Sequence, residues 1–100
     1  MNYILQVDFP HNGHFGDQMS EALADLAKDI AKEEGLNCKY WTECEATKEA
    51  GGVYFFEDEE NAKRYLEMHT KRLESFGYSD IRGRIFKINK PLSRLSKADI

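Results

Sequence analysis

Four consecutive apolar residues, Val53-Tyr54-Phe55-Phe56, constrain the fold of this 100-residue chain more than any other feature. They follow a Gly-Gly pair and precede an acidic cluster, a pattern typical of a short strand. A strand with apolar side chains on both faces is normally covered on both faces. Since a chain of this length builds only one core, the sequence predicts that a partner covers one side of its sheet.

The rest of the hydrophobic pattern predicts two helices and three further strands. Their order, βαββαβ, indicates one ferredoxin-like α+β domain over residues 1–100, with residues 91–100 as a C-terminal tail. The expected strands cover residues 3–9, 38–45, 52–57 and 81–88. The expected helices run from an N-cap at Asp17 to a stop at Gly35, and from an N-cap at Asp58 to a stop at Gly77.

One face of this sheet is predicted to lack a covering layer. Right-handed crossovers would place both helices on the other face, so that either Tyr54 and Phe56 or Val53 and Phe55 point away from the helices. The simplest cover is a second copy of the chain, packed sheet face to sheet face as a twofold homodimer. The space between the two sheets would be an aromatic cavity suited to a flat organic ligand.

Trp41 is the best candidate for a cavity wall on the preceding strand. Trp41 alternates with Lys39 and Glu43, so charged residues flank it on its own face, whereas Tyr40 lies on the opposite face. Because charged neighbours are unusual on a side that packs against helices, we expect Trp41 to face the cavity between the sheets, either stacked on an aromatic ligand or only packed in the interface. A shift of one residue in the strand faces would exchange Trp41 with Tyr40.

Charge and composition argue against several classes of partner. The formal net charge is −4 without a basic cluster, which disfavours nucleic acid. The element order is shared with the RNA-recognition motif, but Glu49, Gly51 and Val53 stand where its octapeptide needs a basic residue and two stacking rings. No apolar run reaches the ~20 residues that cross a bilayer, and the N-terminus does not resemble a secretory signal. We therefore expect a cytoplasmic protein without nucleic-acid or membrane partners.

The sequence offers no cofactor motif. A phosphate-binding loop and a dinucleotide fingerprint are both missing, so a nucleotide or flavin has no support. Cys38 and Cys44 would lie on one strand roughly 20 Å apart, too far for a disulfide, and are expected to be free thiols. His11 and His14 share a loop, which is read as a solvated turn, with a pocket lid as the functional alternative and a metal site only weakly supported.

Two polar residues of the second expected helix are predicted to lie on different faces of it. His69 lies in the middle of the apolar stripe and is either a core histidine or an acid, base or hydrogen-bond donor at the cavity. Arg72 lies off the stripe with other charged residues and is expected on a solvated face.

The whole chain resembles the YdhR family of mono-oxygenases, within the dimeric α/β-barrel superfamily that includes antibiotic-biosynthesis mono-oxygenases. No single stretch is a catalytic signature, but together they are specific for the family. The resemblance rests on five stretches: Asn12-Gly13-His14-Phe15-Gly16-Asp17, Lys39-Tyr40-Trp41-Thr42-Glu43, Glu49-Ala50-Gly51-Gly52-Val53-Tyr54, Tyr65-Leu66-Glu67-Met68-His69-Thr70-Lys71-Arg72-Leu73 and Asn89-Lys90-Pro91-Leu92-Ser93.

The resemblance implies a homodimer and a cofactor-independent oxygenation of a small aromatic, phenolic or quinone-like compound by molecular oxygen. Under this hypothesis Trp41, Tyr54 and Phe56 are cavity walls, and His69 and Gln6 are donors or bases. A non-catalytic ligand-binding or stress-related protein with the same cavity is the main alternative. Haem binding, with His69 as an axial ligand, is a third.

Overall fold

The computed structural model describes residues 1–100 and has the ferredoxin-like α+β fold that the sequence predicts. Four antiparallel strands form one sheet in the order β2-β3-β1-β4. The elements are β1 (Tyr3–Pro10), α1 (Gly16–Ile30), β2 (Leu36–Cys44), β3 (Glu49–Phe56), α2 (Glu59–Ser75), β4 (Arg82–Lys87) and α3 (Lys90–Leu95).

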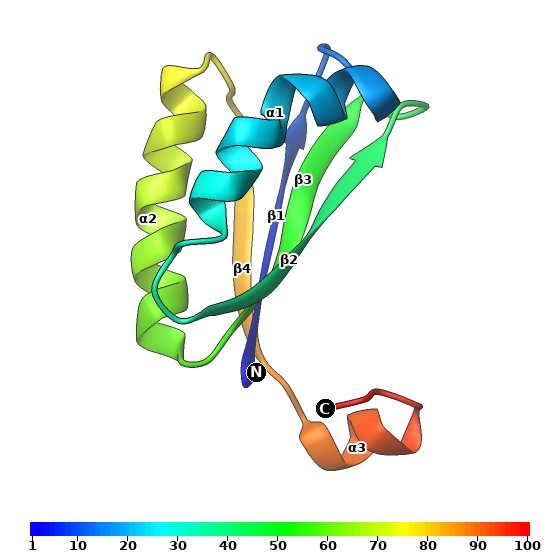
Figure 1. Ribbon diagram of the computed structural model, residues 1–100, viewed down its shortest axis with the longest axis vertical. Coiled ribbons are helices and arrows are strands. Elements are labelled where there is room, and N and C mark those ends of the chain that lie inside the picture. The colour runs from blue at the N-terminus through cyan, green and yellow to red at the C-terminus, as the bar shows by residue number, and fades with distance from the viewer.

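Helices α1 and α2 cover the same face of the sheet, as Figure 1 shows. The core lies between them and the sheet, because alternate residues of the two central strands point toward the helices. In β1 these are Leu5, Val7 and Phe9, and in β3 they include Tyr54 and Phe56, all of them buried. Of the two alternatives left open by the sequence, Tyr54 and Phe56 therefore face the helices.

Local sequence signals explain the ends of α2. The side chain of Asp58 accepts a hydrogen bond of 2.7 Å from the backbone N–H of Asn61, which confirms the predicted N-cap. Gly77 follows the helix with a φ of +96°, a conformation that glycine adopts at little cost.

The predicted ends of α1 are wrong. Phe15 occupies the N-cap position without a side-chain hydrogen bond, and Asp17 lies in the first turn, where its charge favours the helix N-terminus. The helix ends at Ile30, and Gly35 instead has a φ of +79° in the turn that enters β2. Strand β3 also begins earlier than predicted, at Glu49, because the chain turns within residues 45–48.

The register of β2 corrects the prediction for Trp41. Trp41 lies opposite Gly52 and Lys39 lies opposite Tyr54, which places both β2 side chains on the face that carries the helices. The bare face receives Tyr40 instead, whose ring packs edge-on against Phe55 with centroids 6.1 Å apart.

The charged neighbours that misled the prediction have specific contacts on the helix side. The Lys39 ammonium nitrogen lies 3.3 Å from the centroid of the Trp41 ring. The Glu43 carboxylate accepts a 3.1 Å hydrogen bond from the backbone N–H of Gly16 at the start of α1. Since β2 is an edge strand, both long side chains lie at the rim of the layer, where the Glu43 carboxylate is hydrogen-bonded and the Lys39 ammonium contacts only aromatic rings.

The other face of the sheet has no cover within the chain. Tyr40 is 64% exposed and Phe86 40% exposed on this face, although both are aromatic. We call it the open face. The strand registers place these residues on it: Ile4, Gln6, Asp8, Cys38, Tyr40, Thr42, Val53, Phe55, Arg82, Arg84 and Phe86.

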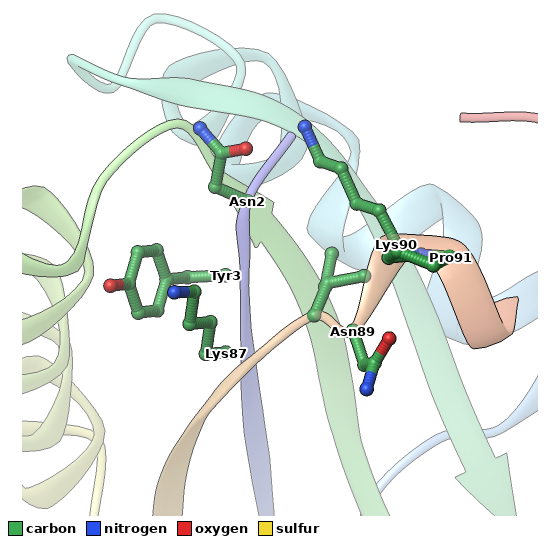
Figure 2. Close-up of a pocket in the computed structure, with 7 residues that line it drawn as sticks. Asn2, Tyr3, Lys87, Asn89, Lys90 and Pro91 are labelled. Carbon is green, nitrogen blue, oxygen red and sulfur yellow. The ribbon is translucent and has the colours of Figure 1, made fainter.

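The C-terminal helix α3 extends beyond the end of the sheet (Figure 1). Asn89 caps it through a 3.2 Å hydrogen bond from the N–H of Leu92, yet Leu92 and Leu95 are 61% and 84% exposed. Where the tail leaves the sheet, a wide hollow of about 660 Å³ is lined by the ends of β1 and β4 and the start of α3. Figure 2 shows Tyr3 and Lys87 side by side there, and Lys90 at the base of the tail.

None of the three helices combines the length and the apolar character that a transmembrane segment requires.

Candidate functional site

A partly enclosed cavity of about 180 Å³ lies between α1, α2 and the helix-covered face of the sheet. Ten of its fourteen lining residues are hydrophobic. Strands β2 and β3 contribute Lys39, Trp41 and Tyr54, and α2 contributes His69 and Leu73. The rest of the lining comes from Phe9, His11, Met19, Leu23, Leu26, Ala50, Gly51, Phe76 and Tyr78.

The structure brings together three of the five residues that the sequence nominated. Trp41, Tyr54 and His69 all line this cavity, which a single copy of the chain forms between its helices and its sheet. Gln6 lies on the open face, across the sheet from the cavity, because it alternates with the buried Leu5 and Val7. Phe56 is fully buried in the core and does not line the cavity.

His69 is buried, and its hydrogen bonds define its tautomer. The Arg72 guanidinium donates to Nδ1 of His69, with Nε and a terminal nitrogen of Arg72 at 3.2 and 2.9 Å. Nδ1 is therefore an acceptor, and in the neutral ring the proton lies on Nε2. Nε2 has no hydrogen-bond partner in the protein. Every fully buried side-chain nitrogen and oxygen does have a partner, so Nε2 must be accessible, and it reaches the cavity that His69 lines. It can donate a hydrogen bond to a ligand there.

Burial and neighbouring charge keep His69 neutral. Desolvation, followed by the positive charges of Arg72 and Lys39, lowers the pKa of His69 to about 3. At neutral pH this side chain is a hydrogen-bond donor and not a cation.

The position of Arg72 differs from the prediction of a solvated face. Arg72 is half-buried, and besides His69 its guanidinium contacts the hydroxyl of Tyr65, at 3.3 Å. The helical spacing of three residues from His69 places the two side chains over one another. A positive charge without an acidic partner thus lies directly behind the cavity wall.

Lys39 also belongs to this site, although the sequence pattern did not predict it. Its ammonium nitrogen lies 3.3 Å from the ring centroid of Trp41 and 4.5 Å from that of Tyr54. It forms no ion pair. Desolvation, followed by the charge of Arg72, lowers the pKa of Lys39 to about 7. One feature of the sequence could have identified Lys39. It lies two residues before Trp41 on the same strand, so the two side chains must share one face of the sheet.

Gly52 provides the room for the Lys39 side chain. A Cβ atom at Gly52 would lie 2.5 Å from Cε of Lys39 and 3.2 Å from the Tyr54 ring. A larger residue at this position would therefore displace the lysine stem from its path across the strand.

Tyr54 is positioned by contacts below the cavity. Its hydroxyl accepts a 3.4 Å hydrogen bond from Tyr65, and its ring lies 6.0 Å from the ring of His69. Desolvation, followed by the nearby Tyr65, raises the pKa of Tyr54, so this phenol is not a base at physiological pH.

His11 and Tyr78 form another part of the cavity lining. His11 is only 7% exposed, so the prediction of a solvated turn is wrong for this residue. Its Nε2 donates to the backbone carbonyl of His14 at 2.8 Å, and its Nδ1 accepts from the Tyr78 hydroxyl at 2.6 Å. His14 itself is exposed, and His, Cys, Asp and Glu form no group of three suited to a metal ion.

The volume of the cavity limits its ligands. Sites for drug-sized molecules occupy roughly 300–1,000 Å³, whereas this one has about 180 Å³. One aromatic ring with small substituents fits this space, and a porphyrin does not fit without movement of α1 or α2.

Comparisons with known proteins point to one family. The family model described as "Putative mono-oxygenase ydhR" matches residues 4–99. A solved structure titled "Structural Genomics, protein YJCS" is similar with a TM-score of 0.59 and 18% sequence identity, covering 88% of this chain and 96% of the other. At this identity the similarity shows the fold alone. None of the curated proteins matches the chain in sequence.

Proposed function

Since this chain belongs to the family of the putative mono-oxygenase YdhR, we propose that it oxygenates a one-ring phenol or a related quinone precursor in the cavity beneath α1 and α2. The reaction uses molecular oxygen and needs no organic cofactor or metal. The observation that carries this proposal is the aromatic cavity itself, in which Trp41 and Tyr54 flank a free hydrogen-bond donor on His69.

The proposed chemistry draws all its electrons from the substrate. A phenol with a free ring position reacts with one O₂ to give a quinone and one water, so that one oxygen atom enters the product and the other leaves as water. Triplet oxygen reacts poorly with closed-shell molecules, but an electron-rich phenolate can transfer one electron to it. The protein must therefore hold the anion, limit access of water and deliver a proton to the peroxide formed next.

The side chains of the cavity match these tasks. The ring of Tyr54 and the apolar side chains of α1 provide a weakly polar space for a flat substrate. Trp41, which is 38% exposed, forms the rim of the same space. The Nε2–H of His69 is placed to stabilise a developing negative charge on oxygen, and Arg72 behind it holds the ring in this tautomer.

A homodimer is part of the same proposal. The open face carries exposed aromatic side chains on both edge strands, Tyr40 on β2 and Phe86 on β4, with the partly buried Phe55 between them on β3, which is unusual for a monomer. A second copy, related by a twofold axis, would bury this face against itself. In such a dimer each subunit retains its own cavity, because the cavity lies on the opposite side of the sheet.

Oxygen consumption tests the function. Protein freed of metals and flavin is mixed with single-ring phenols and hydroquinones under an oxygen electrode, with catalase present and the spontaneous oxidation subtracted. We expect uptake that depends on both protein and phenol, with one quinone formed per O₂. The variants Trp41→Ala and His69→Ala should bind more weakly or turn over at least about tenfold more slowly.

Two results would contradict the proposal. Normal binding and turnover by both variants would exclude this cavity as the site. A phenol that raises the melting temperature of the protein without any oxygen uptake would instead identify a binding protein that uses the same cavity. This result would refute the catalytic part of the proposal.

A further inference from the structure

Two basic side chains and no carboxylate surround the aromatic cavity. Lys39 lines it, and Arg72 lies behind His69 in its wall. No aspartate or glutamate lines the cavity, and the ion pairs of the chain include neither Lys39 nor Arg72. Elsewhere in the chain basic residues do find acidic partners, as Lys63 does with Glu59 and Lys71 with Glu67.

None of the elements packed around Lys39 provides a negatively charged group to its ammonium. From α2 it faces His69, which is neutral, and Arg72, which is positive. From β3 it faces the ring of Tyr54, and on its own strand the ring of Trp41. From α1 and its C-cap residue, the cavities that Lys39 lines receive only apolar side chains: Met19, Leu23, Leu26, Ala27, Ile30 and the capping Ala31. The two rings attract the cation only weakly compared with a carboxylate.

We propose that Lys39 is the substrate-recognition residue, which takes the proton of a phenol or enol and then holds the resulting anion as its counter-ion. This inference rests on the proposed function. It specifies the class of substrate as an aromatic compound with an acidic hydroxyl group. The step is a proton transfer from the substrate oxygen to the lone pair of the Lys39 amine, which gives phenolate and ammonium. No oxidant takes part in this step.

The chemistry of the site supports both halves of this role. A pKa of about 7 means that Lys39 is a base of useful strength near neutral pH, and that it becomes a cation when it accepts the proton. Its stem is directed across β3 by the missing side chain of Gly52. A phenolate lying between Lys39 and His69 would receive one charged donor and one neutral donor, the arrangement expected for stabilisation of an oxyanion.

A coloured probe tests the proposal without turnover. The phenolate of 4-nitrophenol is yellow and its neutral form is not, so absorbance reports the ionisation state of the bound probe. The methyl ether 4-nitroanisole has the same ring and cannot ionise. Trp41 is the single tryptophan of the chain, and quenching of its fluorescence reports entry of either probe.

We expect wild-type protein to bind 4-nitrophenol as phenolate, at a pH below that at which the free probe ionises. Lys39→Met should weaken this binding by roughly 10- to 100-fold, the range for a charged hydrogen bond, and should leave 4-nitroanisole binding unchanged. Lys39→Arg should keep the preference for the anion, although it cannot act as a base. Gly52→Ala, which keeps the lysine but displaces it, should weaken phenolate binding only.

The outcomes separate this inference from the proposed function. Equal affinity of wild type for the two probes, or an unchanged preference in Lys39→Met, overturns the role of Lys39 even if oxygen uptake is found. Phenolate binding that depends on Lys39, in a protein that consumes no oxygen, supports the inference and refutes the oxygenase. Unchanged Trp41 fluorescence with both probes refutes the two together. Melting curves confirm folding, which Lys39→Met should not impair because it removes a partly desolvated charge.

Discussion

At the scale of single residues, the site depends on how burial sets the charge of His69. The pKa of this ring is about 3 in the folded protein, well below the value of about 6.5 in an unfolded chain. As the pH falls through 6.5, the unfolded state takes up a proton that the folded state does not accept. The stability associated with neutral His69 is therefore complete above pH 6.5 and is lost as the pH falls toward 3.

Replacement of His69 by glutamine should flatten this dependence. We expect the free energy of unfolding of the wild type to decrease between pH 6 and pH 4 by up to about 1.4 kcal/mol per pH unit more than that of His69→Gln. Urea denaturation at several pH values measures both. Parallel curves for the two proteins would show that His69 titrates normally and is not held neutral.

The same residue scale shows what sequence can and cannot predict. His69 was found because a histidine in an apolar stripe is conspicuous, and Asp58 because a capping side chain acts on its nearest neighbours. Lys39 was missed and Trp41 assigned to the wrong face, because charged residues that alternate with a tryptophan are unusual on a side that packs against helices, and the path of the lysine stem is not visible in the sequence. That path depends on Gly52 of the neighbouring strand, a tertiary fact that no local pattern contains.

At the scale of elements, helix α1 forms one side of the cavity. Only Met19 and Ile30 of this helix are buried, while Leu23 and Leu26 are partly buried and line the cavity. The sequence predicted this amphipathic helix but not the space beneath it, because the volume left between layers depends on how their side chains interlock.

Filling this space should remove ligand binding without unfolding the protein. We expect Leu26→Trp to abolish binding of phenols, since the larger ring occupies the cavity, and to change stability by about 1 kcal/mol or less. Calorimetric titration and thermal melts provide the measurements. Leu95→Trp is the matched control, since Leu95 lies on the tail and is 84% exposed, and it should bind like the wild type. Retained binding by Leu26→Trp would place the ligand elsewhere.

The tail helix α3 is an element that packs against no other element of the chain. Deletion of residues 90–100 should change the unfolding free energy of the isolated subunit by less than about 0.5 kcal/mol, because Leu92 and Leu95 are exposed. Chemical denaturation of the truncated and full chains at low concentration tests this. A large loss of stability would mean that the tail packs against its own sheet.

At the scale of the whole molecule, the open face is the interface of the proposed dimer. We expect Phe55→Glu to convert the proposed dimer into a monomer, since two carboxylates would be buried symmetrically at the interface. Light scattering after size exclusion distinguishes a mass of 11.6 kDa from twice that value. Met68→Glu, on a partly exposed position of α2, is the control and should remain dimeric. A monomeric wild type would refute the dimer but not the cavity, which one subunit completes.

The proposed position of the substrate is tested most directly by a crystal structure of the protein with a bound phenol, prepared without oxygen. We expect the phenol in the cavity beneath α1 and α2, with its ring bordered by Trp41 and Tyr54 and its oxygen within hydrogen-bonding distance of both the Lys39 amine and Nε2 of His69. A phenol located between two sheets, or one whose oxygen faces away from Lys39, would contradict the proposed position.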